Sequence, residues 1–217
     1  MKRLLPAIFF LVPAFALATE PVDLTRDEFK MYRHFVQASE DPRVQKMKPE
    51  SRSAAIAKDA KYRLKDMEKA IVRAEAAGDF KAKCEANIKE AIAACDLAGS
   101  IGKIEVDISE PHAVAYVQWL NENPDKLAYE ASVAAALTNR ACPILSTIQV
   151  WAQDKANAKS RVFQALISSE AAAKINADKA KDFAVTRYLR LFEKVKSVAN
   201  GDDLSSESGT PTASGGG

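Results

Sequence analysis

Apolar residues recur at helical spacing through most of the chain. From about Arg26 onward they return every three or four residues, and strict alternation of apolar and polar residues occurs over Ile104 to Ile108. The first pattern is typical of amphipathic helices, whereas the second indicates a short extended segment. The same region is rich in Ala, Lys, Glu and Leu, which favour helix by intrinsic propensity. The pattern therefore predicts an all-α fold.

Capping residues, prolines and glycines divide this pattern into helices. Thr25-Arg-Asp-Glu28 is a capping box, Pro49 suits a helix start, and Gly78 suits a helix end. We expect one antiparallel domain of about six or seven helices. Their expected ranges are Arg26 to Ser39, Glu50 to Ala77, Asp79 to Ala98, Ser109 to Asn121, Lys126 to Arg140, Pro143 to Ile175 and Asp178 to Ala199.

The two ends of the chain depart from the helical pattern. Lys2 and Arg3 precede an apolar run from Leu4 to Phe15, and Ala16-Leu17-Ala18 then supplies the small residues of a cleavage site. This order is typical of a secretory signal peptide, and the run is too short for a membrane span of about 20 residues. At the other end, 201–217 is rich in Gly, Ser and Thr, which predicts a disordered tail.

These segments define the expected organisation of the protein. We expect a signal peptide over 1–18, a helical domain over 19–200 and a disordered tail over 201–217. The expected location is periplasmic or secreted, with no transmembrane segment left after signal cleavage.

Charge excludes one class of partner and suggests another. The chain has 31 basic and 29 acidic residues, and without Lys2 and Arg3 the two counts are equal, which argues against nucleic-acid binding. Charge is uneven, however, because Arg43 to Arg73 holds ten basic and four acidic residues. The simpler interpretation is a solvated helix face, and the alternative is contact between this stretch and an acidic partner or anionic lipid.

The three cysteines allow one disulfide within the chain. Cys84 and Cys95 are 11 residues apart, which is about 16 Å along one helix, whereas bridged Cα atoms approach to under about 7 Å. In an up-and-down bundle Cys95 and Cys142 lie at the same end, so we expect these two to pair. A bond from Cys84 to Cys142 is the first alternative, because Gly99 to Ser109 is long enough to cross the bundle and place Cys142 at the end where Cys84 lies. The second alternative is that no disulfide forms within the chain.

No linear motif of catalysis or cofactor binding is present. His34 and His112 lack metal-site spacing, and the sequence has no Cys-x-x-Cys pair, phosphate loop or Gly-x-Ser-x-Gly elbow. Cys142 lies at an expected helix start, where a thiol can be activated, but a structural disulfide is the simpler interpretation. Trp119 and Trp151 are interpreted as core residues. We therefore expect no catalytic, metal-binding or cofactor-binding residue and no cofactor.

The sequence favours an exported, non-enzymatic helical protein that acts through protein–protein interaction in the cell envelope or outside the cell. The partner protein is unknown. The second hypothesis is a small-molecule or lipid-binding helical domain with a pocket between helices. The third is an enzyme without a linear motif, which a cleft bringing Cys142 to a histidine would favour.

We predict cleavage between Ala18 and Thr19, because Ala16 and Ala18 are the small residues that signal peptidase accepts. N-terminal sequencing of the exported protein should read Thr-Glu-Pro-Val. Exported protein that still begins with Met1 would contradict the signal peptide.

Overall fold

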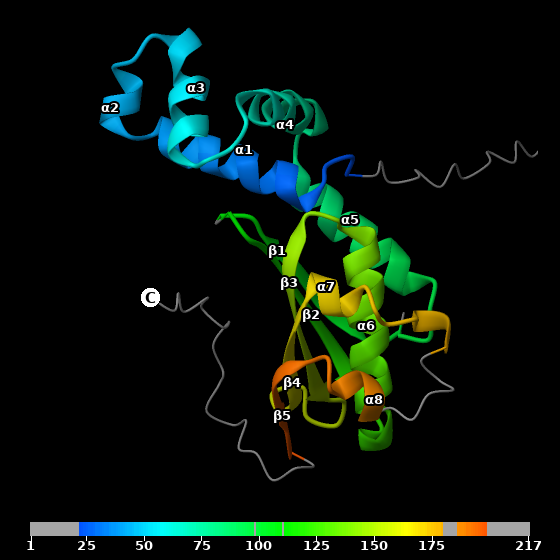
Figure 1. Ribbon diagram of the computed structural model, residues 1–217. Coiled ribbons are helices and arrows are strands. Elements are labelled where there is room, and N and C mark those ends of the chain that lie inside the picture. Colours follow the sequence, from blue (N-terminus) through cyan, green and yellow to red (C-terminus); the bar gives the residue numbers. More distant parts are fainter. Residues whose placement is uncertain (1–21, 98, 110, 180–185, 199–217) are drawn as a thin grey trace, which may run out of the picture.

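The computed structural model of the chain shows an α/β fold with a five-stranded mixed sheet (Figure 1). The all-α helical bundle expected from the sequence is therefore wrong. The structure describes residues 22–97, 99–109, 111–179 and 186–198. The expected signal peptide, its cleavage site and the expected tail over 201–217 lie outside the described residues.

Helices form the first part of the described chain, and strands and helices share the second part. The helices are α1 (Arg26–Ser39), α2 (Pro42–Gln45), α3 (Pro49–Asp59), α4 (Leu64–Ala77), α5 (Phe80–Ala93), α6 (Leu127–Ala141), α7 (Ser169–Ala172) and α8 (Thr186–Leu189), with short 3-10 turns at Pro124–Lys126 and Ala177–Lys179. The strands are β1 (Ile101–Asp107), β2 (Ala113–Asn121), β3 (Leu145–Asp154), β4 (Arg161–Ser168) and β5 (Glu193–Ser197).

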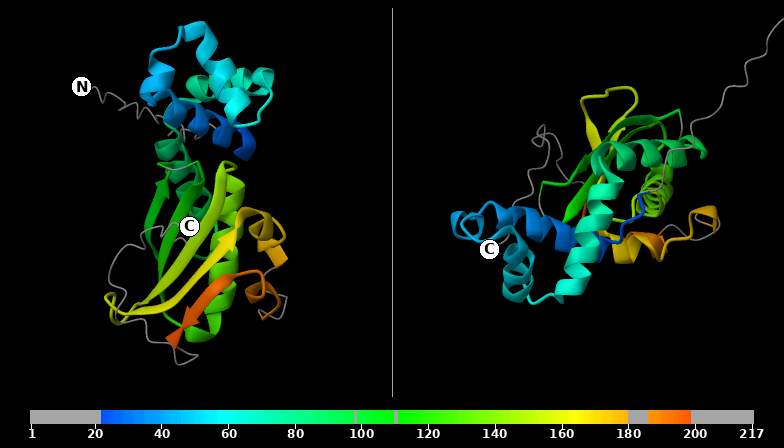
Figure 2. Two further views of the ribbon diagram at one scale, coloured as in Figure 1. Left: turned by 60° about the vertical axis from the view of Figure 1, so that its left-hand side comes forward. Right: turned by 90° about the horizontal axis from the view of Figure 1, so that it is seen from above.

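The sheet has the strand order β1-β2-β3-β4-β5. Neighbouring strands are antiparallel except β2 and β3, which are parallel and are joined through α6. Helices α5 and α6 lie together on one side of the sheet (Figures 1 and 2). The core lies between these two layers, and its fully buried strand residues include Val106, Ala115, Val117, Trp119, Ile148, Val150, Ala165 and Ile167.

The central strands occupy ranges where the sequence pattern predicts helices. The helix expected over Ser109 to Asn121 is β2, and the helix expected over Pro143 to Ile175 is the pair β3 and β4 followed by α7. Strands inside a sheet carry apolar residues on both faces, which obscures the two-residue period. In β2, Val114, Val117 and Leu120 also fit a helical period.

Several helix ends agree with the sequence. In α1 the capping box is present, with Thr25 Oγ1 accepting from Glu28 N at 3.2 Å. Gly78 ends α4 at φ +72°, and Asp79 caps α5 by accepting from Ala82 N at 3.0 Å. The helix expected over Glu50 to Ala77 is two helices, α3 and α4, separated by a turn in which Lys61 has φ +59°. The short segment expected to be extended overlaps β1.

Helices α1 to α4 form a helical lobe, residues 22–77, at one end of the α/β body, residues 80–198 (Figure 1). The lobe has a small core of its own around Ile56 and Met67. It meets the body at Phe80, whose ring centroid lies 5.7 Å from that of Phe29 and 6.0 Å from that of Tyr32. Val22 and Leu24 also pack in the main core, and Arg26 pairs with Glu170 of α7, so several contacts together set where the lobe stands on the body.

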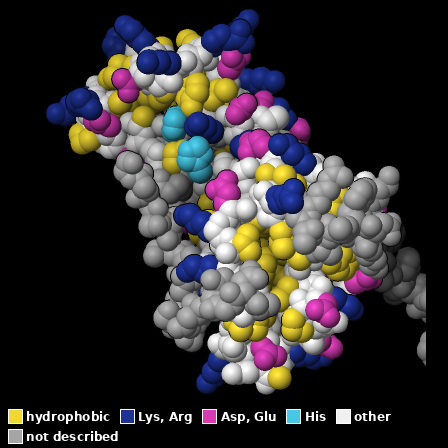
Figure 3. Space-filling view, turned by 60° about the horizontal axis from the view of Figure 1, so that its bottom comes forward, with side chains coloured by type: hydrophobic (Ala, Val, Ile, Leu, Met, Phe, Trp, Pro, Cys, Tyr) yellow, Lys and Arg dark blue, Asp and Glu magenta, His cyan; other side chains and the backbone are white. Residues whose placement is uncertain are grey.

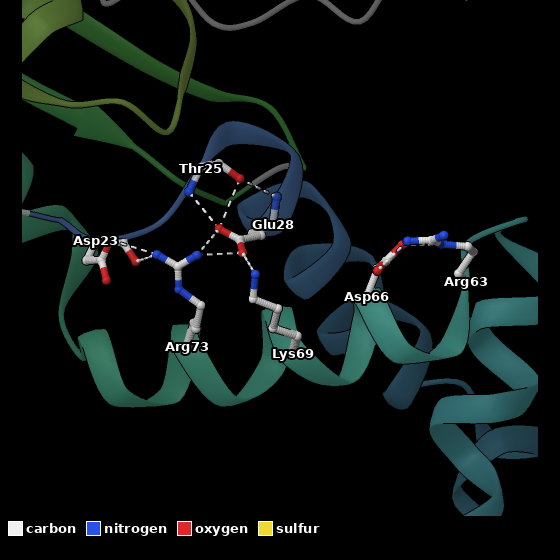
Figure 4. A network of polar contacts seen from close by, with 7 residues as sticks. All are labelled: Asp23, Thr25, Glu28, Arg63, Asp66, Lys69 and Arg73. Atoms are coloured by element: carbon white, nitrogen blue, oxygen red, sulfur yellow. Dashed lines mark hydrogen bonds and ion pairs between the residues drawn. The ribbon is translucent and has the colours of Figure 1, made fainter.

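A polar network holds the start of α1 against α4 (Figure 4). Arg73 donates from Nη1 to Glu28 Oε1 at 2.6 Å and from Nη2 to Asp23 Oδ1 at 2.7 Å. Burial by itself would raise the pKa of Glu28, but the hydrogen bonds from Thr25 and Arg73 hold it below its usual value. The carboxylate of Glu28 therefore stays ionised, which strengthens its bonds to Arg73.

The disulfide joins Cys84 in α5 to Cys142 at the end of α6, with Cα atoms 5.2 Å apart. The expected Cys95 to Cys142 bond is wrong, and Cys95 is a half-buried free thiol. The cause is the number of elements between α5 and α6. With the single helix that the sequence predicts there, the chain crosses the domain once and α6 runs parallel to α5. In the structure two antiparallel strands, β1 and β2, lie between them, so the chain crosses twice and α6 runs antiparallel to α5. Cys142 consequently lies beside Cys84.

We predict that replacing Cys84 and Cys142 together with Ser lowers the free energy of unfolding by about 4 kcal/mol, from the chain-entropy model for a loop of this size. The two cysteines are 58 residues apart in sequence. Guanidinium unfolding measures the change, and Cys95→Ser is the matched control with little expected effect. A Cys95–Cys142 peptide in a non-reducing digest would contradict the pairing.

Candidate functional site

The sheet has a second face that no helix of the described residues covers (Figure 2). We call it the uncovered face. Strand alternation and register place on it Lys103, Glu105 and Asp107 of β1, Val114, Tyr116, Gln118 and Leu120 of β2, Thr147, Gln149, Trp151 and Gln153 of β3, Arg161, Gln164, Leu166 and Ser168 of β4, and Glu193 and Lys196 of β5. Two aromatic residues and four glutamines therefore share this face.

An aromatic pair forms the floor of the uncovered face. The ring centroids of Tyr116 and Trp151 lie 6.2 Å apart, and each residue is only 6 % exposed. The guanidinium carbon of Arg161 lies 5.6 Å from the Trp151 ring centroid, a cation–π arrangement. Around this floor, the half-buried side chains of Val114 and Leu166 add apolar surface that remains accessible.

Amide groups surround the aromatic pair and are already oriented. Gln118 Nε2 donates to Gln153 Oε1 across β2 and β3. Arg161 Nη1 donates to Gln164 Oε1 at 2.7 Å within β4. Since each amide has further donor and acceptor sites, these bonds fix its orientation and leave capacity for bonds to another molecule.

Burial raises the pKa of Tyr116, and the nearby carboxylates of Asp107 and Glu105 raise it further. Its hydroxyl therefore stays protonated at neutral pH and remains a hydrogen-bond donor. The centre of the uncovered face thus combines amide, hydroxyl and apolar side chains with Arg161 over a packed aromatic floor, and the other charged residues lie on the outer strands β1 and β5.

The two edges of the sheet are protected against pairing with another strand. At β1, the Glu85 carboxylate of α5 accepts from the Val106 backbone N–H at 2.9 Å. At the other edge, β5 is five residues long, contains two lysines, and has Lys194 at φ +50°. Short, charged and irregular edges discourage strand addition. A contact with this sheet is consequently favoured at its face.

The two tryptophans interpreted as core residues lie on opposite faces of the sheet. Trp119 is fully buried beneath the helices and donates from Nε1 to Glu130 Oε2 at 2.8 Å. Trp151 is also buried, but on the uncovered face. Its face depends on strand register alone. Gln149 and Gln153, two residues before and after it, lie on the same face of β3 and were the cue in the sequence once the strand is recognised.

The two histidines are brought near each other although they are distant in sequence. His34 lies in α1, His112 lies just before β2, and Arg33 donates to the backbone oxygen of Ser109 at the same contact. The Tyr62 hydroxyl and His34 Nδ1 share a hydrogen bond of 3.0 Å. Burial lowers the pKa of His34, and the positive charges of Lys30 and His112 lower it further.

Cys142 is not available as a nucleophile because its sulfur is bonded to Cys84. The enzyme hypothesis that relied on a Cys142 thiol and a histidine therefore loses its nucleophile. Among the described residues, no group of three or more His, Cys, Asp or Glu side chains could hold a metal ion.

Pockets between and beside the helices are open and carry charged side chains. The pocket between α5 and α6 has a volume of about 450 Å³ and is lined by Cys95, Tyr129, Leu137 and Arg140, among others. A smaller pocket of about 260 Å³ lies where β2 and β3 end, lined by Asn121, Leu127 and Asp154. Neither brings together a recognisable set of catalytic groups.

Comparisons of the chain with protein families, with curated proteins and with solved structures found no match. Within the part of the chain that the structure describes, every helix is too short or too polar to cross a membrane. The Cys84–Cys142 disulfide is compatible with an extracellular protein, since such bonds persist in oxidising compartments.

We predict that the protein loses stability as the pH falls below about 6.5, the ordinary pKa of a histidine. The folded-state pKa of His34 is lowered, so the unfolded chain binds the proton more readily and protonation favours unfolding. One such group contributes a slope of at most about 1.4 kcal/mol per pH unit. Guanidinium unfolding between pH 5 and 8 measures the slope.

His34→Gln should flatten this pH dependence, because the amide does not titrate. Tyr62→Phe is the matched control, since it removes the hydrogen bond to His34 while keeping the imidazole. A slope that is unchanged in His34→Gln would assign the pH dependence to other groups.

Proposed function

We propose that this chain is an exported, non-enzymatic protein that acts through contact with a partner protein in the periplasm or outside the cell. The uncovered face of the sheet is the contact surface in this proposal. The observation that carries it is the Tyr116–Trp151 pair with Arg161, set among amide and apolar side chains on a face without a covering helix. Tryptophan, tyrosine and arginine are the residue types that dominate binding energy at protein interfaces.

The chemistry of the uncovered face supports a protein partner. Its centre holds a single charged side chain, Arg161, while Gln118, Gln153 and Gln164 supply amide donors and acceptors beside apolar side chains. Depletion of charge in the centre and polar groups around it are typical of protein interfaces. The aromatic floor is already packed and the amides around it are already hydrogen-bonded, so association would immobilise few side chains, which reduces the entropic cost of binding.

Small-molecule binding is the second candidate. The pocket between α5 and α6 lies where that hypothesis places it, and its volume of about 450 Å³ suits a small ligand. Its lining is mostly apolar, but Asp96, Arg140 and Asp178 also line it and the pocket is widely open, so it would leave much of a bound ligand exposed to solvent. The protein-contact function therefore has the stronger support.

Photo-crosslinking tests the proposed contact surface. A benzophenone side chain replaces Gln118 or Gln164 on the uncovered face, and Lys89, an exposed residue of α5, is the matched control position. In the native envelope or medium, both positions on the uncovered face should give the same discrete adduct, and Lys89 should not. An excess of this protein without the benzophenone should compete for the same partner and so reduce the amount of adduct.

Leu166→Glu places a charge on a half-buried position of the uncovered face and should weaken the adduct about tenfold, a typical loss for a central interface residue. Circular dichroism checks that this variant is folded. Equal labelling from Lys89, or no competable adduct from either face position, would refute the proposed surface.

A further inference from the structure

The helical lobe carries a second surface whose composition differs from that of the uncovered face. Three arginines of the stretch from 43 to 73 are paired with carboxylates inside the lobe. Arg43 binds Asp41 at 2.8 Å, and Arg63 binds Asp66 at 2.6 Å. Arg73 binds Glu28 and Asp23, as Figure 4 shows together with the Arg63 pair. These arginines are therefore largely neutralised by the lobe's own carboxylates.

Arg52 also has a structural role in the lobe. It donates from Nη2 to the backbone oxygen of Gln45 at 2.8 Å and from Nε to that of Met47 at 3.2 Å. These bonds hold the corner between α2 and α3. That corner carries Met47 between Lys46 and Lys48, so Arg52 holds this segment in place.

Of the lysines in the same stretch, only Lys69 has such a partner, Glu28. The other five are exposed and form no ion pair with the described residues, and together they leave the lobe with excess positive charge. They are Lys46, Lys48, Lys58, Lys61 and Lys65. Figure 3 shows lysine and arginine side chains around the outer part of the lobe. The excess positive charge of residues 43–73 thus lies on exposed lysines.

Exposed apolar side chains accompany these lysines. Of the four large apolar residues in the described chain that are more than a third exposed, three lie in the lobe: Met47 at 36 %, Leu64 at 39 % and Val72 at 66 %. Met47 stands between Lys46 and Lys48, and Leu64 precedes Lys65. Apolar side chains flanked by lysines are typical of segments that bind the interface of an anionic bilayer.

We propose that the helical lobe binds the headgroup region of an anionic lipid surface, with the five unpaired lysines contacting lipid phosphates and Met47 and Leu64 entering the interface. The spacing of the apolar residues favours lipid over an acidic protein. Met47 lies just before α3 and Leu64 is the first residue of α4, so α3 stands between them, an 11-residue helix of about 16 Å. Isolated insertion points suit a fluid surface, whereas a protein partner requires one continuous complementary patch.

The place of the lobe in the fold makes this contact independent of the proposed protein contact. Helices α2 and α3 lie at the end of the molecule farthest from the sheet (Figure 1). Lipid bound there leaves the uncovered face accessible. The protein would then hold a partner at the membrane surface, although each contact can fail without the other.

Vesicle flotation with the mature protein tests this inference. The probes are vesicles of phosphatidylcholine alone and vesicles that contain phosphatidylglycerol as well. We expect binding to the anionic vesicles only. Replacing Lys46, Lys48 and Lys65 with Gln should weaken it about 100-fold, since each lysine near an anionic surface contributes about a fivefold factor. Replacing Lys89, Lys126 and Lys159 of the α/β body with Gln is the control with the same charge change.

Met47→Gln and Leu64→Gln test insertion separately from charge. Binding by the unchanged protein should persist in part at high salt, which screens the lysines, and this remainder should be lost in the two variants. Equal binding to neutral and anionic vesicles, or equal loss in the control triple variant, would overturn the inference. Binding to polyglutamate without binding to anionic vesicles would overturn it in favour of an acidic protein partner. Photo-crosslinking from the uncovered face is unaffected by any of these results.

Discussion

The parallel pairing of β2 with β3 is the constraint on which the rest of the body depends. A parallel pair needs a crossover connection, and α6 supplies it by packing on one face of the sheet. Helix α5 lies antiparallel to α6 on that face, and the Cys84–Cys142 bond joins the two. The other long helices belong to the lobe, and α7 and α8 have four residues each. The described chain therefore has no long helix left to cover the second face.

This distribution of helices separates the two proposed contact surfaces. The uncovered face belongs to the body, and the surface with the five unpaired lysines belongs to the lobe. Phe80, Phe29 and Gly78 lie at the junction between the two parts. The disulfide anchors α5 a few residues after this junction.

The candidate site was only partly predictable from the sequence. The positive stretch from Arg43 to Arg73 was visible in composition, but which cations remain unpaired depends on contacts such as Arg73 with Glu28, which are 45 residues apart. The aromatic residue Trp151 could be interpreted as buried, and it is. That it lies opposite Trp119, on the face without helices, required the pairing of β2 with β3.

The sequence by itself determined the local features of the fold: the capping box at Thr25, the helix end at Gly78, the cap at Asp79 and the extended character of Ile104 to Ile108. These depend on backbone chemistry within a few residues. Only the tertiary structure decided that β2, β3 and β4 are strands, since apolar residues such as Val114, Trp151 and Leu166 on the uncovered face interrupt the alternation that reveals a strand. It also decided the disulfide, because the added traverse of β1 and β2 reverses α6 and brings Cys142 to Cys84.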